Sequence, residues 1–530
     1  MELFKKKPKL EVPEREEEPV FKVDLEPKIP NFPDVLREQV NIKYPLISPY
    51  AYAHIFWDER NKELVYYVQE PKLTDQEKKI LNLLEEGIKE LINISYLAVK
   101  KGETVVVYLE KNLRVLLTEL RIDLTKESYL KIMYYIYRDF VGLNKVEPLL
   151  DDYFIEDIEC NGVNLPIYVV HRKYRNMRTN VTFKKTKELA SFVEKLAQKC
   201  GHYISYANPL LDGALPDGSR VNATFTEDIS SRGPTFTIRK FTKRPWTPTQ
   251  LMYLRTISPE ILAYLWLLIE YERNVMIVGG TGSGKTTLLN GLTFFIPPQA
   301  RVVSIEDTRE LNIEHSNWLP SVAREGVGLA NLVGQKYGEV SLFSLLKESF
   351  RQNPDYVIVG EVRGKEAYVL FQGMSSGHPS LGTMHANSVD TMIKRLETPP
   401  ISLSASLVET LDVVVVMTQS KISGKPVRRV REVVEIIDVE DKRHSATINR
   451  PFIWDPKRDT FVFNSDSHVF KKLVMHHGIN EQELLNEYNK RARLLVKLYK
   501  NQVFDFHEVQ KVINEYYKDP ETVLSRFGVT

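Results

Sequence analysis

A glycine-rich stretch directly after an apolar run constrains this chain more than any other feature. Residues 279–290 read GGTGSGKTTLLN and follow the apolar residues 275–278 without a break. This order predicts a buried strand that turns through a loop into a helix beginning near Lys285. Glycines permit positive φ angles and let backbone N–H groups surround an anion, and a helix N-terminus attracts negative charge. The stretch therefore predicts a phosphate-binding loop in an α/β fold.

Each residue type in the loop answers one requirement of a nucleoside triphosphate. Lys285 is expected to reach the β and γ phosphates, and the Thr286 hydroxyl to hold Mg²⁺. A glycine turn that merely connects a strand and a helix is the alternative, but the complete spacing in this context favours nucleotide binding. The predicted ATP cradle comprises Gly279, Gly280, Thr281, Gly282, Ser283, Gly284, Lys285, Thr286 and Thr287.

Size and composition narrow the class of protein. The chain has 530 residues, which predicts about three or four domains, and its 43% hydrophobic and 27% charged residues are typical of a soluble globular protein. The 72 Lys plus Arg against 70 Asp plus Glu give no chain-wide reason to expect nucleic acid as a partner. Cys160 and Cys200 suit a reducing cytosol, and we expect two small buried side chains whose pairing stays open.

The sequence predicts no membrane insertion. Residues 1–8, MELFKKKP, lack the apolar core of a signal peptide, and the longest apolar candidate, residues 261–269, falls well below the ~18 residues of a spanning helix. Any work at a membrane is therefore expected to pass through a partner.

The N-terminal part of the chain divides into two predicted regions. Residues 1–40 mix charge runs with recurrent prolines, which predicts a flexible arm or a segment wrapped on the surface. Residues 41–145 hold a β-type stretch at 50–68 and two amphipathic helical patterns, the first opened by Thr74 and Glu77 in capping-box spacing. We expect a mainly helical subdomain.

A different pattern follows. Residues 146–242 alternate short strands with a helix at 186–200 that Gly201 is expected to end, and they predict a small α+β domain. Residues 243–254 are expected to form a linker, because two prolines at 245 and 248 interrupt regular structure there.

Buried strands alternate with helices from residue 255 to 440, which predicts a largely parallel sheet covered by helices. A turn at 423–425 suggests a β-ribbon at the sheet edge. Residues 441–530, where Asn480 and Glu483 have capping-box spacing, predict an appendage of small helices. The strand candidates are 274–278, 301–305, 356–359 and 413–417.

Two acidic groups follow predicted strands. Glu306 and Asp307 come at the carboxyl end of a parallel strand, where α/β sheets bind ligands. We take Glu306 as the residue that positions or activates the attacking water, with a solvated acidic turn as the alternative. Glu361 ends the apolar strand 356–359 as the second nucleotide motif does beside Mg²⁺, although a glycine precedes it and leaves direct metal contact open.

Two histidines lie in the small-residue stretch GHPSLGTMHA at 377–386. His385 is interpreted as a γ-phosphate sensor, whereas His378 fits a hydrogen-bonded structural role better.

These motifs, in this order, resemble the type II/type IV secretion ATPase family. The resemblance rests on GGTGSGKTT at 279–287, SIEDTREL at 304–311, PDYVIVGEVRG at 354–364 and GHPSLGTMHA at 377–386, and YAYAHI, LPDGSRVNATF and FTIRKF resemble its archaeal branch. It implies a RecA-like core in a hexameric motor on a polytopic membrane platform protein at the inner face of the cell membrane. The sequence lacks the four-cysteine module of many bacterial relatives, so we expect no zinc.

The resemblance also implies two arginines that reach the nucleotide phosphates across a domain boundary. Arg220 and Arg239 match these positions best, with Arg232 as a weaker candidate and surface ion pairs as the structural alternative. Their approach and release would move domains about the linker at 243–248.

Two other functions are compatible with these motifs. A RecA-like nucleic-acid motor would use the same nucleotide chemistry, and its best support is the basic stretch 425–431, although alternation with valine favours a solvated strand face. A phosphotransferase or a slowly hydrolysing switch is a second competitor. The filament or secretion system served, the direction of movement and the protomer that supplies the arginines stay open.

Overall fold

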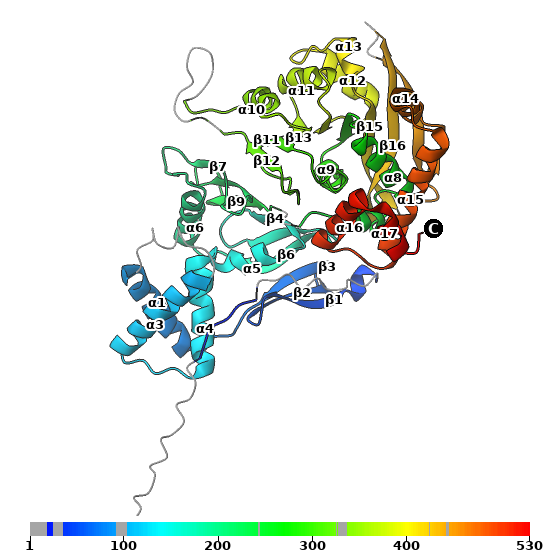
Figure 1. Ribbon diagram of the computed structural model, residues 1–530. Coiled ribbons are helices and arrows are strands. Elements are labelled where there is room, and N and C mark those ends of the chain that lie inside the picture. The colour runs from blue at the N-terminus through cyan, green and yellow to red at the C-terminus, as the bar shows by residue number, and fades with distance from the viewer. Residues whose placement is uncertain are drawn as a thin grey trace, which may run out of the picture. The chain divides into compact units, whose positions relative to one another are not determined.

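The computed structural model describes residues 19–24, 35–91, 103–241, 244–324, 326, 337–422, 425–440 and 445–529. The chain divides into two units, Met1–Phe241 and Thr242–Thr530. Each unit has its own sheet, which holds nine strands within the described residues (Figure 1).

The sheet of the first unit is antiparallel apart from one parallel pair, β3 with β6. Its strands lie in the order β1-β2-β3-β6-β5-β4-β9-β8-β7. The strands are β1 Asn41–Ile47, β2 Ala51–Asp58, β3 Glu63–Gln69, β4 Ile155–Cys160, β5 Pro166–His171, β6 Arg175–Thr182, β7 Leu210–Ala214, β8 Arg220–Thr224 and β9 Thr235–Arg239. The α-helices are α1 Asp75–Leu91, α3 Glu103–Glu119, α4 Lys126–Ile136, α5 Glu147–Asp151 and α6 Thr186–Lys199.

The predicted helical region 41–145 shares this sheet with the predicted α+β domain. Residues 41–69 form three strands, because Ala51, Ala53 and Ile55 alternate with less buried neighbours and all turn into the core. The carboxylate of Asp152 then joins the two regions, since it accepts hydrogen bonds from the hydroxyls of Tyr44 on β1 and Tyr66 on β3, at 2.7 and 2.5 Å.

Two local expectations in this unit are confirmed. The capping box before α1 forms: the Thr74 N–H donates to Glu77 Oε2 at 2.7 Å, and the Glu77 N–H donates to Thr74 Oγ1 at 3.2 Å. Gly201 follows the end of α6 with φ +73°, the left-handed conformation that glycine adopts without strain.

The predicted N-terminal arm lies largely outside the described residues. Within residues 19–24, the Phe21 side chain is buried and stacks on Tyr50, with 5.1 Å between ring centroids. The Phe21 N–H donates to the Glu110 carboxylate of α3 at 3.4 Å. This short piece is therefore part of the core of the first unit rather than a free arm.

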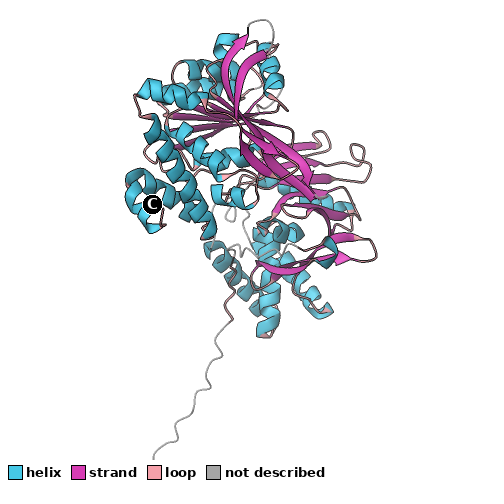
Figure 2. Cartoon of the chain, turned by 90° about the vertical axis from the view of Figure 1, so that its right-hand side faces the viewer, coloured by secondary structure: helices cyan, strands magenta, loops and turns pink. Residues whose placement is uncertain are grey.

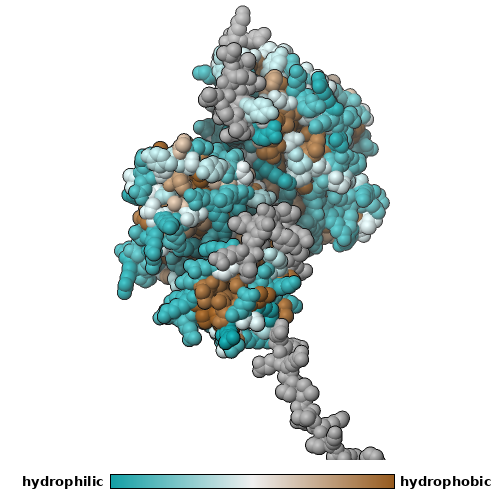
Figure 3. Space-filling view, turned by 90° about the vertical axis from the view of Figure 1, so that its left-hand side faces the viewer, coloured by the Kyte–Doolittle hydropathy of each residue, from teal (hydrophilic) through white to brown (hydrophobic). Residues whose placement is uncertain are grey.

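The helices α1 and α3 leave large apolar side chains at the surface. Leu83, Val107, Val115 and Leu120 are exposed. Figure 3 shows apolar side chains gathered in the part of the molecule where Figure 1 places these helices.

The sheet of the second unit is parallel from β12 to β15 and antiparallel from β15 to β18. Its strands lie in the order β12-β11-β13-β14-β10-β15-β16-β17-β18. They are β10 Val275–Gly279, β11 Val302–Glu306, β12 Trp318–Val322, β13 Tyr356–Val362, β14 Ser380–Met384, β15 Val413–Ile422, β16 Lys425–Glu440, β17 Ser445–Asp455 and β18 Thr460–Phe463. The four predicted strands are all present, so a mixed α/β fold is established.

Helices cover both faces of this sheet (Figures 1 and 2). Val275 and Ile277 of β10 pack in the core formed with α8, α9 and the C-terminal helices, whereas Met276 and Val278 face the core formed with α10–α13. The helices are α7 Pro248–Tyr253, α8 Pro259–Glu270, α9 Lys285–Thr293, α10 Leu342–Ser349, α11 Glu366–Ser375, α12 Val389–Glu397, α13 Ala405–Val408, α14 His468–His477, α15 Glu481–Lys500, α16 Phe506–Lys518 and α17 Pro520–Arg526.

Two expectations in this unit are corrected. Residues 445–463, predicted as helical appendage, form two strands, because Phe452 and Trp454 alternate into the core with the period of a strand. Residues 248–253, predicted as linker, form α7, because Pro248 takes the first helical position, which needs no N–H donor, and Thr247 with Gln250 forms a capping box.

The apolar residues 261–269 are buried on every side within α8, as expected of a helix in the interior of a large core. Among the described residues, no helix combines the length and the apolar character that crossing a membrane would require.

Candidate nucleotide site

The glycine-rich loop connects β10 to α9, as predicted. Gly282 and Gly284 have φ values of +71° and +94°, which L side chains rarely adopt. A Cβ on Gly279 would lie 2.6 Å from Ser283 Oγ and 2.7 Å from the Met417 carbonyl oxygen. Ser283 Oγ in turn donates to the Gly280 carbonyl at 2.8 Å. The shape of the loop therefore requires its glycines.

Lys285 is held by two partners at the start of α9. Its ammonium donates to the Gly280 carbonyl at 3.1 Å and lies 3.2 Å from His385 Nδ1. The Lys285 side chain is mostly buried, and this burial lowers its pKa from the ordinary value. The predicted phosphate-binding lysine and the predicted sensor histidine are thus direct neighbours, although 100 residues separate them in sequence.

His385 joins Lys285 to Glu361. Its Nε2 lies 3.1 Å from Glu361 Oε1. Because Nδ1 faces the Lys285 ammonium, a neutral ring carries its proton on Nε2, where it faces the carboxylate. Burial, followed by the positive charge of Lys285, lowers the pKa of His385 and favours this neutral form.

Glu361 lies in a bulge of β13. The pairing of β13 with β14 shifts between Val359 and Val362, and Thr383 Oγ1 donates to the Gly360 carbonyl at 2.7 Å. A bulge of this kind turns a side chain away from its regular direction. Glu361 is thereby aimed at His385 and Arg363, with Oε2 accepting from Arg363 at 2.6 Å.

The pKa of Glu361 lies below its ordinary value. Burial alone would raise it, but the hydrogen bond and charge of Arg363, together with the charges of His385 and Lys285, outweigh burial. Arg363 also lies 3.6 Å from Asp307 Oδ2. One guanidinium therefore connects both predicted acidic motifs.

Glu306 is almost fully buried, with 1% of its surface exposed. Oε1 accepts from the backbone N–H groups of Glu310 and Leu311 at 2.9 and 2.8 Å. Oε2 is also buried, and none of the described groups donates a hydrogen bond to it. Burial raises the pKa of Glu306 to about 7, against the effect of the two N–H groups. A carboxyl with such a pKa suits a general base near neutral pH.

Gly360 makes room for Glu306. A Cβ at position 360 would lie 3.0 Å from Glu306 Cγ, closer than ordinary contact allows. The glycine before Glu361, which sets this motif apart from an ordinary one, thus leaves space for the Glu306 side chain from the neighbouring strand β11.

Sequence reasoning missed Asn290, a buried amide on α9. Its Nδ2 donates to the Glu310 carbonyl at 3.2 Å, and its Oδ1 accepts from the Asn312 N–H at 3.0 Å. The turn that holds Glu306 is thereby tied to the helix that follows the phosphate loop. The position of Asn290 directly after Leu288 and Leu289 was the available signal, because a polar side chain beside buried apolar ones needs hydrogen-bond partners.

Arg220 and Arg239 belong to the first unit and lie opposite each other on β8 and β9. Arg220 pairs with Asp212 at 2.8 Å, and Arg239 lies 3.5 Å from Asp157. Their side chains are 39% and 63% exposed. Both arginines thus make the surface ion pairs named as their structural alternative. The backbone carbonyl of Arg232 accepts a hydrogen bond from the Val163 N–H at 2.9 Å.

His378 and the basic stretch 425–431 make contacts that stabilise the fold. The His378 ring packs on Phe350, with 4.9 Å between centroids. The expectation of a solvated strand face is wrong for Arg429, which is buried although this stretch pairs with β15 and the pairing of β16 with β17 begins only at Glu432. Arg429 is buried there and makes a bidentate pair with Asp459 at 2.8 and 2.9 Å. Residues 423 and 424 of the predicted turn lie outside the described residues.

The two cysteines are free thiols. Cys160 is buried on β4, and burial raises the pKa of both Cys160 and Cys200 to about 11. Thiols with such pKa values stay protonated and unreactive at neutral pH.

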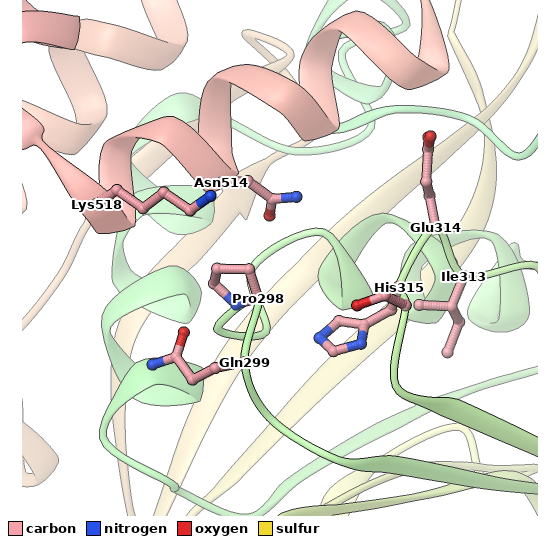
Figure 4. A pocket seen from close by; sticks show the side chains of 8 residues that line it. Pro298, Gln299, Ile313, Glu314, His315, Asn514 and Lys518 are labelled. Carbon is pink, nitrogen blue, oxygen red and sulfur yellow. The ribbon is translucent and has the colours of Figure 1, made fainter.

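A second concave region lies against α16 (Figure 4). Its volume is about 730 Å³. Asn514 and Lys518 of α16 face Pro298, Gln299 and His315 across it. Glu314, which precedes His315, lies 2.5 Å from the His507 ring at the start of α16. The segment that follows the Glu306 turn is therefore in contact with the C-terminal helices.

The family model described as "Type II/IV secretion system protein" matches residues 141–444, more than half of the chain. The chain is 36% identical over 520 residues to an uncharacterized protein of Methanocaldococcus jannaschii, covering 93% of this chain and 92% of that one. It is also 30% identical over 268 residues to the type IV secretion system protein PtlH of Bordetella pertussis, covering 44% of this chain and 76% of that one. The chain belongs to the type II/IV secretion system protein family.

Two solved structures were also matched. The VirB11 ATPase of the Brucella suis type IV secretion system is 24% identical, with 54% of this chain and 92% of that chain covered and a TM-score of 0.28. The ATPase DotB of Legionella pneumophila is 18% identical, with coverages of 72% and 95% and a TM-score of 0.40. The family assignment rests on the family model and the relative that spans nearly the whole chain.

Proposed function

We propose that this chain is an ATP-hydrolysing motor of the type II/IV secretion family. The observation that carries the proposal is the line of contacts from the phosphate loop through Lys285 and His385 to Glu361, beside the buried Glu306. Membership of the secretion family supports the same function, and so do the relatives that are named as secretion proteins and ATPases.

The two carboxylates have opposite electrostatic settings. Glu306, with a pKa raised to about 7, is assigned to orient the attacking water and accept its proton through the buried Oε2. Glu361, with its pKa lowered, stays ionised and is assigned to the metal side of the site. Pairs of acids whose pKa values are pushed apart are typical of divided acid–base roles.

The residues of the loop fit ATP with Mg²⁺. The positive-φ glycines leave backbone N–H groups for phosphate oxygens, and Glu306 Oε2 keeps its capacity to accept a hydrogen bond. Thr286 and, through water, Glu361 would hold Mg²⁺, which neutralises phosphate charge when bound. Lys285 would exchange its Gly280 and His385 partners for phosphate oxygens.

His385 would report the arrival of the γ-phosphate. When Lys285 turns to phosphate, Nδ1 of the histidine loses its donor, and the Nε2 contact with Glu361 readjusts. The change would pass to Arg363 and Asp307 through the same line of contacts.

Arg220 and Arg239 are proposed to stabilise charge on the transferring phosphoryl group. Their present ion pairs are partly exposed, and pairs of this kind contribute only about 0–1 kcal/mol, so exchange for a phosphate costs little. ATP would then join the phosphate loop to the first unit, and hydrolysis would release it, with residues 243–248 as the hinge.

The assembled motor is proposed to be a homo-hexamer with a RecA-like core, docked on a polytopic membrane protein at the inner face of the cell membrane. It would power assembly of an archaellum or type IV pilus-like filament, or secretion. The exposed apolar side chains of α1 and α3 support a protein contact on the first unit.

The test is phosphate release by the purified chain with ATP and Mg²⁺, compared with Lys285→Ala. Wild-type turnover that Lys285→Ala abolishes is expected. Absence of nucleotide binding in the wild type would overturn the proposal, and tight binding without turnover would indicate a switch. Light scattering after size-exclusion chromatography with a non-hydrolysable analogue tests the hexamer.

A nucleic-acid motor is not favoured by the ribbon arginines. Arg429 is committed to Asp459, and Arg431 to Glu432 at 2.6 Å. Stimulation of turnover by single-stranded DNA, in place of a membrane partner, would reverse this preference.

A further inference from the structure

The β15–β16 ribbon runs past the phosphate loop. Gly279, the last residue of β10, pairs with Met417 of β15, and β15 continues to Ile422. The returning strand β16 places Arg428 opposite Gln419. These two side chains therefore belong to the part of the ribbon that extends beyond the end of β10, alongside the loop.

Both side chains lie against the loop glycines. A Cβ on Gly284 would meet Arg428 Cδ at 3.4 Å, and a Cβ on Gly282 would meet Gln419 Oε1 at 3.6 Å. The Nε atom of Arg428 is buried. Gly284 immediately precedes α9, so Arg428 lies at the helix N-terminus where phosphate oxygens are expected.

The order of the strands places Arg428 on one flank of the loop and the hydrolytic residues on the other. β14, which leads to His385, lies on one side of β10, with β13 and Glu361 beyond it. β15 lies on the opposite side of β10. A side chain from the ribbon is therefore expected to lie nearer to the α- and β-phosphates than to the γ-phosphate that is transferred.

The neighbouring arginine serves a different purpose. Arg429 points to the other face of the strand and is fixed by Asp459 and by the Leu254 carbonyl at 3.0 Å. Arg431 contacts the carboxylate of the adjacent Glu432. Arg428 is the ribbon arginine that lies against the loop.

We infer that Arg428, supported by Gln419, is a nucleotide-binding residue that contacts the α- and β-phosphates from within the same chain. A guanidinium matches adjacent phosphate oxygens with paired N–H donors. This inference rests on the proposed nucleotide binding. The Arg428 guanidinium would contact ATP and ADP alike, whereas Lys285 and His385 respond to the γ-phosphate.

The experiment measures the Kd of a fluorescent ADP and of a non-hydrolysable ATP analogue for wild type, Arg428→Ala, Arg428→Lys and the matched control Arg431→Ala. Loss of one charge-assisted contact predicts a Kd about tenfold higher for both nucleotides in Arg428→Ala. Arg428→Lys, which keeps the charge and the aliphatic stem, is expected to recover part of the affinity. Arg431→Ala is expected to bind as wild type does.

An unchanged Kd in Arg428→Ala, or a loss confined to the ATP analogue, would overturn the inference. Thermal unfolding without nucleotide separates misfolding from lost contact. If Arg428→Ala is unstable, the comparison of Arg428→Lys with Arg431→Ala decides, since equal affinity in these two variants and wild type contradicts a fork-shaped phosphate contact. A wild-type chain that binds no nucleotide contradicts the proposed function itself, whereas wild-type binding with unaffected Arg428 variants contradicts this inference alone.

Discussion

The candidate site residues of the two units are held in opposite ways. Glu306 in the second unit is 1% exposed and accepts two backbone hydrogen bonds. Arg239 in the first unit is 63% exposed and has an aspartate at 3.5 Å. The first arrangement fixes a side chain at one place, because moving it would strand a buried carboxylate, whereas the second releases its side chain at little cost.

Under the proposed function, this difference would give the two units separate tasks. The acids near the phosphate loop would be in position before a nucleotide arrives, as chemistry requires. The arginines keep partners that a phosphate can replace. A motor that alternates between a joined and a separated state needs one fixed and one exchangeable side.

The largest effect is expected from Glu306→Gln. Loss of the base predicts turnover about 10³-fold lower, while nucleotide affinity stays near wild type, because the loop itself is untouched. Steady-state phosphate release and fluorescent-ADP titration measure the two quantities. Near-normal turnover would remove the assignment of Glu306.

Removing the charge of the two arginines of the first unit is expected to have the next largest effect. Arg220→Gln and Arg239→Gln predict turnover about 10²-fold lower with little change in ADP affinity, because the lost contact forms mainly with the transferring group. Arg232→Gln serves as the control from the same unit. If all three variants retain wild-type rates, Arg220 and Arg239 are ion-pair residues only.

Gly360→Ala tests how closely Glu306 is fixed. The added Cβ lies 3.0 Å from Glu306 Cγ, so the carboxylate must shift. A displaced base predicts a rate about tenfold lower, with nucleotide affinity retained. Single-turnover kinetics measure the chemical step. A wild-type rate would show that the base position tolerates movement.

The pH dependence follows from the raised pKa of Glu306. The base must be ionised, so the rate is expected to fall as pH decreases through about 7. Between pH 7 and pH 6 the ionised fraction predicts a decrease of about fivefold in kcat. The residual activity of Glu306→Gln should lack this inflection, and an inflection retained there would assign it to another group.

The smallest effect is expected from Asp212→Asn. The exposed pair with Arg220 is predicted to contribute less than about 1 kcal/mol, so the free energy of unfolding should change little and turnover should remain at least at the wild-type level. Chemical denaturation measures the first quantity. A large loss of stability would show that Arg220 is fixed after all, and would remove the contrast between the units.

The sequence predicted what local pattern determines. The strand, loop and helix around residues 275–293 follow from apolar periodicity and glycine spacing, and the strand predicted at 356–359 follows from its valine and isoleucine run, although in the structure it continues to Val362. The contact of Lys285 with His385 joins residues 100 positions apart, and only the sheet order brings them together. No local pattern contains that order.

The incorrect expectations also have local causes. The alternation of basic residues and valine at 425–431 resembles a half-exposed strand, but Asp459, in the turn between β17 and β18, pairs with Arg429 and holds it in a buried position. Pro248 resembles a helix breaker and proves to be a helix initiator, because position in the helix decides its effect. A tertiary neighbour thus decides the first case, and the local helix start decides the second.

The internal partners of Lys285 have a consequence for product departure. If the proposed hydrolysis takes place, the ammonium can return to the Gly280 carbonyl and the His385 ring when ADP and phosphate leave, so the empty loop would contain no unpartnered buried cation. These internal acceptors would then compete with the product for the N–H donors of Lys285. Such competition would weaken product binding and favour the next cycle.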